Sequence, residues 1–121
     1  MFALRGATSV ATNEAEPILS ASETLVGTIL ERNRLTAKQI LSAYFTSTPD
    51  LNAAFPAAGA RRAGFQEVPM MCAQEIAVPN APERIVRVML HVDGKPEVPV
   101  QHVYLGDATR LRPDLAQPKP T

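Results

Sequence analysis

A stripe of apolar residues in the first third of the chain repeats at intervals of three and four positions. This spacing places the side chains on one face of an α-helix. Asn13 and Glu16 resemble a capping box, and Pro17 falls in the first turn, where proline is tolerated. The pattern predicts an amphipathic helix of roughly five turns that ends near Asn33. The stripe consists of Ile18, Ser22, Leu25 and Ile29, with Leu19, Val26 and Leu30 beside it.

Alternating apolar positions and runs of β-forming residues predict about five strands in the rest of the chain. At the N-terminus, Phe2 and Leu4 alternate with Ala3 and Arg5, and we expect Gly6 to end this strand. Residues 51–64 have small side chains and no clean period, which is typical of a short helix or a structured loop. The other predicted strands are 40–47, 65–71, 84–92 and 101–105.

One long helix with five strands predicts an α+β fold, in which the helix packs on one face of a mixed sheet. A chain of 121 residues is most simply one domain, and we place it at residues 1–115. Pro113, Pro118 and Pro120 favour an extended, partly mobile segment, and we place a flexible tail at residues 116–121. A single helix covers only part of one sheet face, so the other face must be buried elsewhere, which points to self-association.

Composition excludes several classes of protein. The hydrophobic fraction of 45% and the charged fraction of 20% are values of a globular chain. A net charge of zero and only six aromatic residues argue against nucleic-acid binding. No apolar run approaches the ~18 residues of a membrane span, so we expect no membrane association and a cytoplasmic protein.

Arginines are the most informative polar residues. Arg87 interrupts the apolar run "RIVRVMLHV", and a buried guanidinium without an anionic partner is costly. The anion must come from the protein or from a ligand. Arg5, Arg61 and Arg112 also lie at strand ends or in loops, and each alone is better explained by an ion pair. As a set they suggest a pocket that binds a small dianion.

Other catalytic chemistry has weaker support. Cys72 is the only cysteine, which excludes an intrachain disulfide and a cysteine zinc site. His91 and His102 lack metal-ligand spacing, and the chain has no glycine-rich phosphate loop. A Cys72–His102 nucleophile pair stays open, although a lone cysteine is more often inert packing. We therefore expect neither a metal nor a cofactor.

Five segments occur in the order found in a known family: "RGATSV", "TPDLNAAFPAAGAR", "VPMMCAQE", "RIVRVMLHV" and "HVYLGDATRLRPDL". From about Leu4 to Leu115 the chain resembles the monofunctional chorismate mutases of the trimeric α/β type, as distinct from the all-helical type. The resemblance implies a homotrimer whose sheets form the core (a pseudo α/β barrel), with helices outside and active sites between subunits. It also implies the pericyclic rearrangement of chorismate, a dicarboxylate, to prephenate in phenylalanine and tyrosine biosynthesis.

The resemblance assigns roles to individual residues. Arg5 would grip a substrate carboxylate, Arg87 would face the ether oxygen of the breaking bond, and Glu75 would bind the ring hydroxyl. Further substrate contacts are implied for Phe55, Ala57, Arg61, Met70, Met71, Cys72, Tyr104, Leu111 and Arg112.

The chain departs from the family pattern in the central segment. Ala58 stands where a lysine can occur, Met71 stands where a threonine can occur, and the loop "ARRAGF" is one residue shorter. The choice between Arg61 and Arg62 is therefore open. The alternative function is a non-catalytic trimeric module that binds a small carboxylate metabolite at the same arginines.

Overall fold

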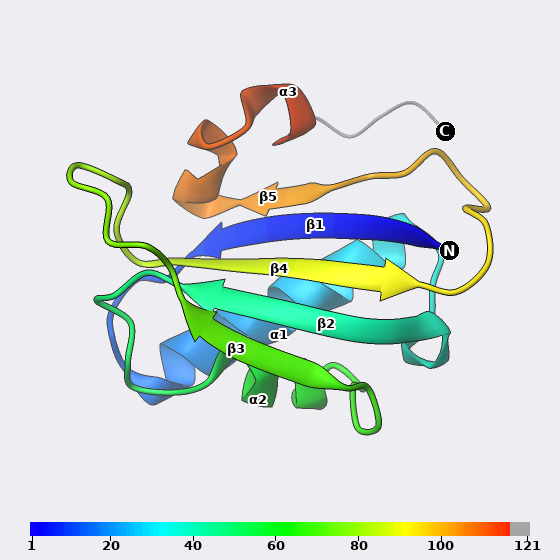
Figure 1. Cartoon of the computed structure of the whole chain (residues 1–121), viewed down its shortest axis with the longest axis horizontal. Helices are drawn as coiled ribbons and strands as arrows, with labels where there is room; N and C mark the ends of the chain where they lie inside the picture. The colour runs from blue at the N-terminus through cyan, green and yellow to red at the C-terminus, as the bar shows by residue number, and fades with distance from the viewer. Residues whose placement is uncertain (117–121) are drawn as a thin grey trace.

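The computed structural model describes residues 1–116 as an α+β fold, with one mixed sheet and the two longer helices on one of its faces (Figure 1). The predicted fold class is therefore confirmed for the single chain. The strands are β1 (Phe2–Ser9), β2 (Ile40–Ser47), β3 (Met70–Gln74), β4 (Ile85–Val92) and β5 (Val103–Leu105). The helices are α1 (Ala15–Arg32), α2 (Pro56–Arg62) and the short α3 (Pro113–Ala116), with 3₁₀ turns η1 (Ala37–Gln39) and η2 (Gly106–Arg110).

The strand order is β3-β2-β4-β1-β5, so β4 lies at the centre of the sheet. It runs antiparallel to β1 and β2, whereas the edge strands β5 and β3 run parallel to β1 and β2 respectively. In register, Arg87 of β4 lies between Ala7 of β1 and Thr46 of β2. The central strand thus carries the arginine that interrupts its apolar run.

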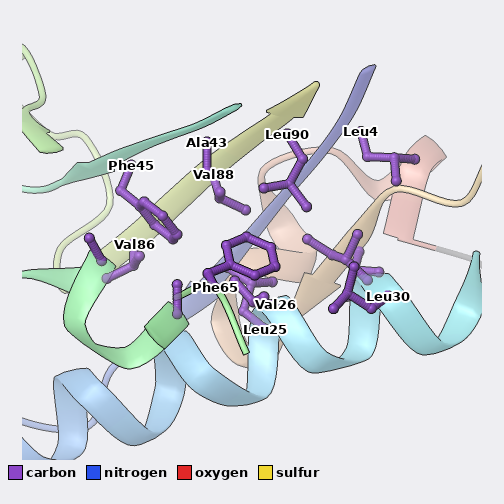
Figure 2. Packing of buried hydrophobic residues seen from close by; sticks show 14 of the residues in the cluster. Leu4, Leu25, Val26, Leu30, Ala43, Phe45, Phe65, Val86, Val88 and Leu90 are labelled. Atoms are coloured by element: carbon purple, nitrogen blue, oxygen red, sulfur yellow. The ribbon is translucent and has the colours of Figure 1, made fainter. Parts of the chain in front are cut away.

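The predicted long helix is confirmed as α1, and its apolar stripe packs on the sheet. Figure 2 shows Leu25, Val26 and Leu30 of the helix opposite strand residues such as Phe45 and Leu90. Each fully buried side chain of this size contributes roughly 1.5–3 kcal/mol to stability. This packing fixes which face of the sheet is covered.

The expected capping box at the start of α1 is wrong. The N-cap is Glu14, and it makes no side-chain cap hydrogen bond. The Asn13 carboxamide oxygen instead accepts the backbone N–H groups of Asn52 and Ala53, at 3.0 and 3.1 Å. Asn13 therefore holds the loop before α2, a long-range contact that local spacing does not reveal.

Gly6 does not end the first strand, which continues to Ser9. A Cβ at Gly6 would lie 2.7 Å from the Val103 carbonyl oxygen and 3.0 Å from Cδ1 of Ile29. Glycine is thus needed because β5 and α1 both approach the backbone of β1 here, and its conformational freedom is not used.

Two other predicted strands begin later than expected. The segment 65–71 forms a strand only from Met70, because the N–H of Phe65 and the N–H of Gln66 are used in turns after α2. Residue 101 is excluded from β5, because Asn33 at the end of α1 binds both its backbone N–H and its carbonyl, at 2.8 and 2.9 Å. Local turns thus set the start of β3, whereas a long-range contact sets the start of β5.

The C-terminal segment also differs from expectation. Pro113 was expected to favour extended chain but begins the short helix α3. Residues 117–121, most of the predicted flexible tail, lie outside the described part of the chain. No helix within residues 1–116 has the length and apolar character needed to cross a bilayer.

The sheet face opposite α1 and α2 carries large apolar side chains that are accessible in the single chain. Tyr44 lies in register between Met89 and Met71, and these three side chains are 45%, 37% and 66% exposed. Exposed apolar neighbours of this size are typical of an interaction surface. We call this face the open face of the sheet.

Two glycines provide a matched test of the packing between β1 and α1. Gly6→Ala should destabilise the fold by about 1–3 kcal/mol, because the new methyl group meets a backbone carbonyl that cannot move freely. Gly27→Ala lies within α1, and its added Cβ would meet nothing within 4 Å beyond its chain neighbours and the backbone of its own helix, so it should stabilise the fold by up to about 1 kcal/mol. Chemical denaturation at one protein concentration measures both, and equal effects would contradict this description.

Candidate active site

A cavity of about 500 Å³ lies on the open face, over β1, β2, β4 and β5. Alternate residues of a strand point to the same face of the sheet, which brings the side chains of this cavity together. The alternate positions are Arg5 and Ala7 of β1, Tyr44 and Thr46 of β2, and Arg87 and Met89 of β4. The cavity is lined by Arg5, Gly6, Ala7, Tyr44, Thr46, Arg87, Val88, Met89, Tyr104, Leu111 and Arg112.

Three of the predicted arginines line this one cavity. Arg5 comes from β1, Arg87 comes from β4, and Arg112 precedes α3. The register of β1 and β4 makes Arg5 and Arg87 diagonal neighbours on the open face. Two guanidinium groups at such positions repel one another unless an anion lies nearby. The cavity is thus suited to a ligand with more than one negative charge.

Arg87 has a carboxylate partner within the chain. Its Nε donates to Oε2 of Glu75 at 3.0 Å, and the side chains of Arg87 and Glu75 are 44% and 17% exposed. The same Oε2 accepts the hydroxyl of Thr46 at 2.7 Å. The expectation that Arg87 is buried is therefore wrong for the single chain, because β4 alternates and Arg87 points to the open face. Its two Nη atoms, with four N–H donors, are not used in the contact with Glu75.

Tyr104 and the segment after η2 close one side of the cavity. Tyr104 pairs with Ala7 and is buried in a small cluster that also includes Ala108, with Leu111 and Leu115 packed against it. Arg112 binds Asp114 through two hydrogen bonds, from Nε to Oδ1 at 3.1 Å and from Nη2 to Oδ2 at 2.8 Å. These bonds lower the pKa of the Asp114 carboxyl and raise the pKa of Arg112. Arg112 is thus held as a cation beside the cavity.

A second group of predicted residues lies elsewhere. Phe55 and Cys72 line a separate cavity of about 380 Å³ between β2, β3 and the start of α2. Cys72 pairs with the buried Phe45 and therefore points away from the open face. Ala57 is buried within α2, and Met70 is half-buried at the start of β3. Phe55 is 73% exposed, which is unusual for a phenylalanine unless another surface covers it.

The choice between Arg61 and Arg62 is narrowed by an ion pair between α1 and α2. Arg62 donates to both carboxylate oxygens of Glu16, at 2.7 and 2.9 Å. These hydrogen bonds lower the pKa of Glu16 and raise that of Arg62. Arg62 is engaged in holding the two helices together, whereas Arg61 is exposed and its carbonyl accepts the Gln66 amide. Arg61 is therefore the better candidate for a substrate contact.

The Cys72–His102 nucleophile pair is wrong within the chain. Cys72 lies on β3 and His102 immediately precedes β5, and these strands are opposite edges of the sheet. Four strand spacings separate them by roughly 20 Å. The Nδ1 atom of His102 instead accepts the backbone N–H of Arg5 at 3.1 Å.

Sequence reasoning missed Thr46 and Tyr44, which both line the arginine cavity. Their alternation within "ILSAYFTS" indicates that they share a face of β2. It does not indicate that β2 pairs with β4 in the register that places Thr46 beside Arg87. Thr46 could have been identified only from the pairing of β2 with β4.

Comparison with known proteins agrees with this geometry. The family model of chorismate mutase type I matches residues 1–115. The chain is 42% identical over 114 residues to the chorismate mutase AroH of Thermus thermophilus, covering 93% of each chain. It is 38% identical over 120 residues to chorismate mutase AroH of Bacillus subtilis, covering 98% of this chain and 94% of the relative.

A solved structure of a similar protein has the same fold. The chorismate mutase from Clostridium thermocellum superposes with a TM-score of 0.86 and is 41% identical, covering 91% of this chain and 99% of the other. The family match, the two relatives and this structure all span nearly the whole described chain. The chain belongs to the chorismate mutase type I family.

Proposed function

We propose that the protein is a chorismate mutase that converts chorismate to prephenate in aromatic amino acid biosynthesis, as a homotrimer in the cytoplasm. The observation that carries the function is the placement of Arg87 on the open face, beside Glu75 and in one cavity with Arg5 and Arg112. Loss of the diene absorbance of chorismate tests it directly. A non-catalytic carboxylate-binding module is not favoured, because the matching family and relatives are chorismate mutases.

The reaction requires no proton transfer and no covalent intermediate. The enzyme must restrict the enolpyruvyl arm and stabilise the charge that develops as the carbon–oxygen bond lengthens. Arg5 and Arg112 supply cations for the substrate carboxylates, and two fixed clamps hold the arm in a reactive geometry. Orientation of this kind lowers the barrier without any chemical group acting on the substrate.

Arg87 supplies the electrostatic part of catalysis. The ether oxygen gains negative charge in the transition state, so a guanidinium placed against it stabilises the transition state more than the ground state. Glu75 holds the Arg87 Nε, so the Nη donors can meet the ether oxygen. The Glu75 carboxylate can also accept the ring hydroxyl, and its negative charge suits the positive character that the ring acquires.

Two incomplete groups of residues support a site shared between subunits. The arginine cavity lies on the open face, whereas Phe55, Cys72 and Arg61 lie near α2 and do not line it. Phe55 is accessible in the single chain, as are the apolar side chains of the open face. A trimer would bury this face and bring the α2 group of one subunit to the arginine cavity of the next.

Substitution of Arg87 tests the electrostatic role. Arg87→Ala should raise the activation barrier by at least ~3 kcal/mol, as for the loss of one oxyanion donor. Arg87→Lys should restore only part of the activity, because an ammonium lacks the fork that contacts Glu75 and substrate together. Steady-state kinetics with chorismate measure both variants. Activity of either within tenfold of wild type would refute this role.

Substitution of Cys72 separates this mechanism from nucleophilic catalysis. Cys72→Ser should keep most of the activity, because the rearrangement needs no thiolate and the residue points away from the open face. The kinetics are compared at equal protein concentration, with the oligomeric mass checked by light scattering. Complete loss of turnover in a folded trimer would contradict the pericyclic assignment.

Complementation tests the shared site. Arg87→Ala inactivates the arginine cavity, and the double variant Phe55→Ala, Arg61→Ala impairs the α2 group. Every trimer that contains both variants has three interfaces. One of these interfaces joins the intact arginine cavity of a Phe55→Ala, Arg61→Ala subunit to the intact α2 group of an Arg87→Ala subunit. Refolding an equimolar mixture should therefore restore about one quarter of the wild-type activity.

The controls for complementation are each variant refolded alone and a mixture of native trimers without refolding. All three should stay near the low activity of the parent variants. If the refolded mixture shows no gain although light scattering finds trimers, the two groups belong to one subunit and the shared site is wrong.

A further inference from the structure

Thr46 is a polar residue of the arginine cavity to which the proposed mechanism gives no role. Its hydroxyl donates to Oε2 of Glu75 at 2.7 Å, the same oxygen that accepts Nε of Arg87 at 3.0 Å. Hydroxyl-to-carboxylate bonds of this length are charge-assisted and strong. One carboxylate oxygen thus holds a side chain from β2 and a side chain from β4.

The position of Glu75 explains why it needs such a contact. Glu75 is the first residue after β3, at the edge of the sheet, and it begins the loop that leads to β4. Its backbone N–H donates to the Ser47 carbonyl of β2 at 2.9 Å, which fixes the main chain. The backbone contact does not fix the side-chain torsions, so the orientation of the carboxylate depends on its own hydrogen bonds.

Threonine is suited to this task because its β-branched side chain is stiff at χ1. In register, Thr46 lies between Arg87 of β4 and Ala73 of β3. The hydroxyl therefore holds Oε2 beside the guanidinium. A donor from the substrate would then meet the other oxygen, Oε1.

We propose that Thr46 is a positioning residue that acts through Glu75. Its hydroxyl orients the carboxylate so that Oε2 holds Nε of Arg87 and Oε1 is presented to the ring hydroxyl of the substrate. The inference rests on the proposed chorismate mutase function. It assigns to Thr46 an effect on the transition state, where the orientation of Arg87 matters most, and a smaller effect on ground-state binding.

The test compares two variants of Thr46. Thr46→Val keeps the shape and the strand preference but removes the hydroxyl, and it should lower kcat about tenfold with a smaller change in KM. Thr46→Ser keeps the hydroxyl and should recover most of kcat. Thr28→Val is the matched control, because the Thr28 hydroxyl binds only a helix carbonyl of α1, and its kcat should equal that of wild type.

A double-mutant cycle with Glu75→Ala shows whether Thr46 acts through the carboxylate. In the Glu75→Ala background, Thr46→Val should have almost no further effect on kcat/KM. Thermal unfolding identifies a merely structural effect, and Thr46→Ala replaces the valine variant if that variant does not fold.

The outcomes separate this inference from the proposed function. Wild-type protein that leaves chorismate unchanged would overturn the function and the inference with it. Active wild type with an unaffected Thr46→Val variant would overturn the inference alone. Equal losses from Thr46→Val with and without Glu75 would assign Thr46 a direct contact with substrate and would also overturn it.

Discussion

A single carboxylate oxygen, Oε2 of Glu75, joins three adjacent strands of the sheet. Thr46 of β2 and Arg87 of β4 both donate to it, and Glu75 itself follows β3. A charged group on the central strand needs a partner, because desolvation of a guanidinium is costly. The chain supplies one anion, the Glu75 carboxylate, to Nε of Arg87. The Nη donors stay available for a second anion. The empty site is thus stable and still able to bind an anionic substrate.

The sequence predicted the elements that depend on local pattern. The apolar stripe of α1 and the β-forming run 40–47 agree with the structure because each element buries one face against its neighbours. The predictions failed where a contact with a distant part of the chain determines the local structure. Gly6 continues β1 because β5 and α1 approach it, and Asn13 binds the loop at 52–53 rather than capping its own helix.

The sequence allowed the chemical character of the site to be predicted, but not which residues lie together in it. The arginines were recognisable because a permanent charge in or beside an apolar strand demands an anion, and the resemblance supplied the role of each. Strand register decides which of them meet, and register was not readable from one sequence. Thr46 was missed for this reason, since it is unremarkable until β2 pairs with β4. The division of the predicted residues between two cavities follows from the same cause.

The open face carries both apolar side chains and arginines, and the proposed trimer would affect each group. Its apolar side chains, including Tyr44, Met71 and Met89, gain from removal from water. In the proposed trimer its arginines would lose hydration where a neighbouring subunit covers them, which would strengthen their attraction to a bound dianion. A neutral chain has no excess charge to oppose association of its subunits. Burial of the apolar residues would therefore drive the proposed assembly, and in it the fixed guanidinium groups of the cavity would act on the substrate with little competition from water.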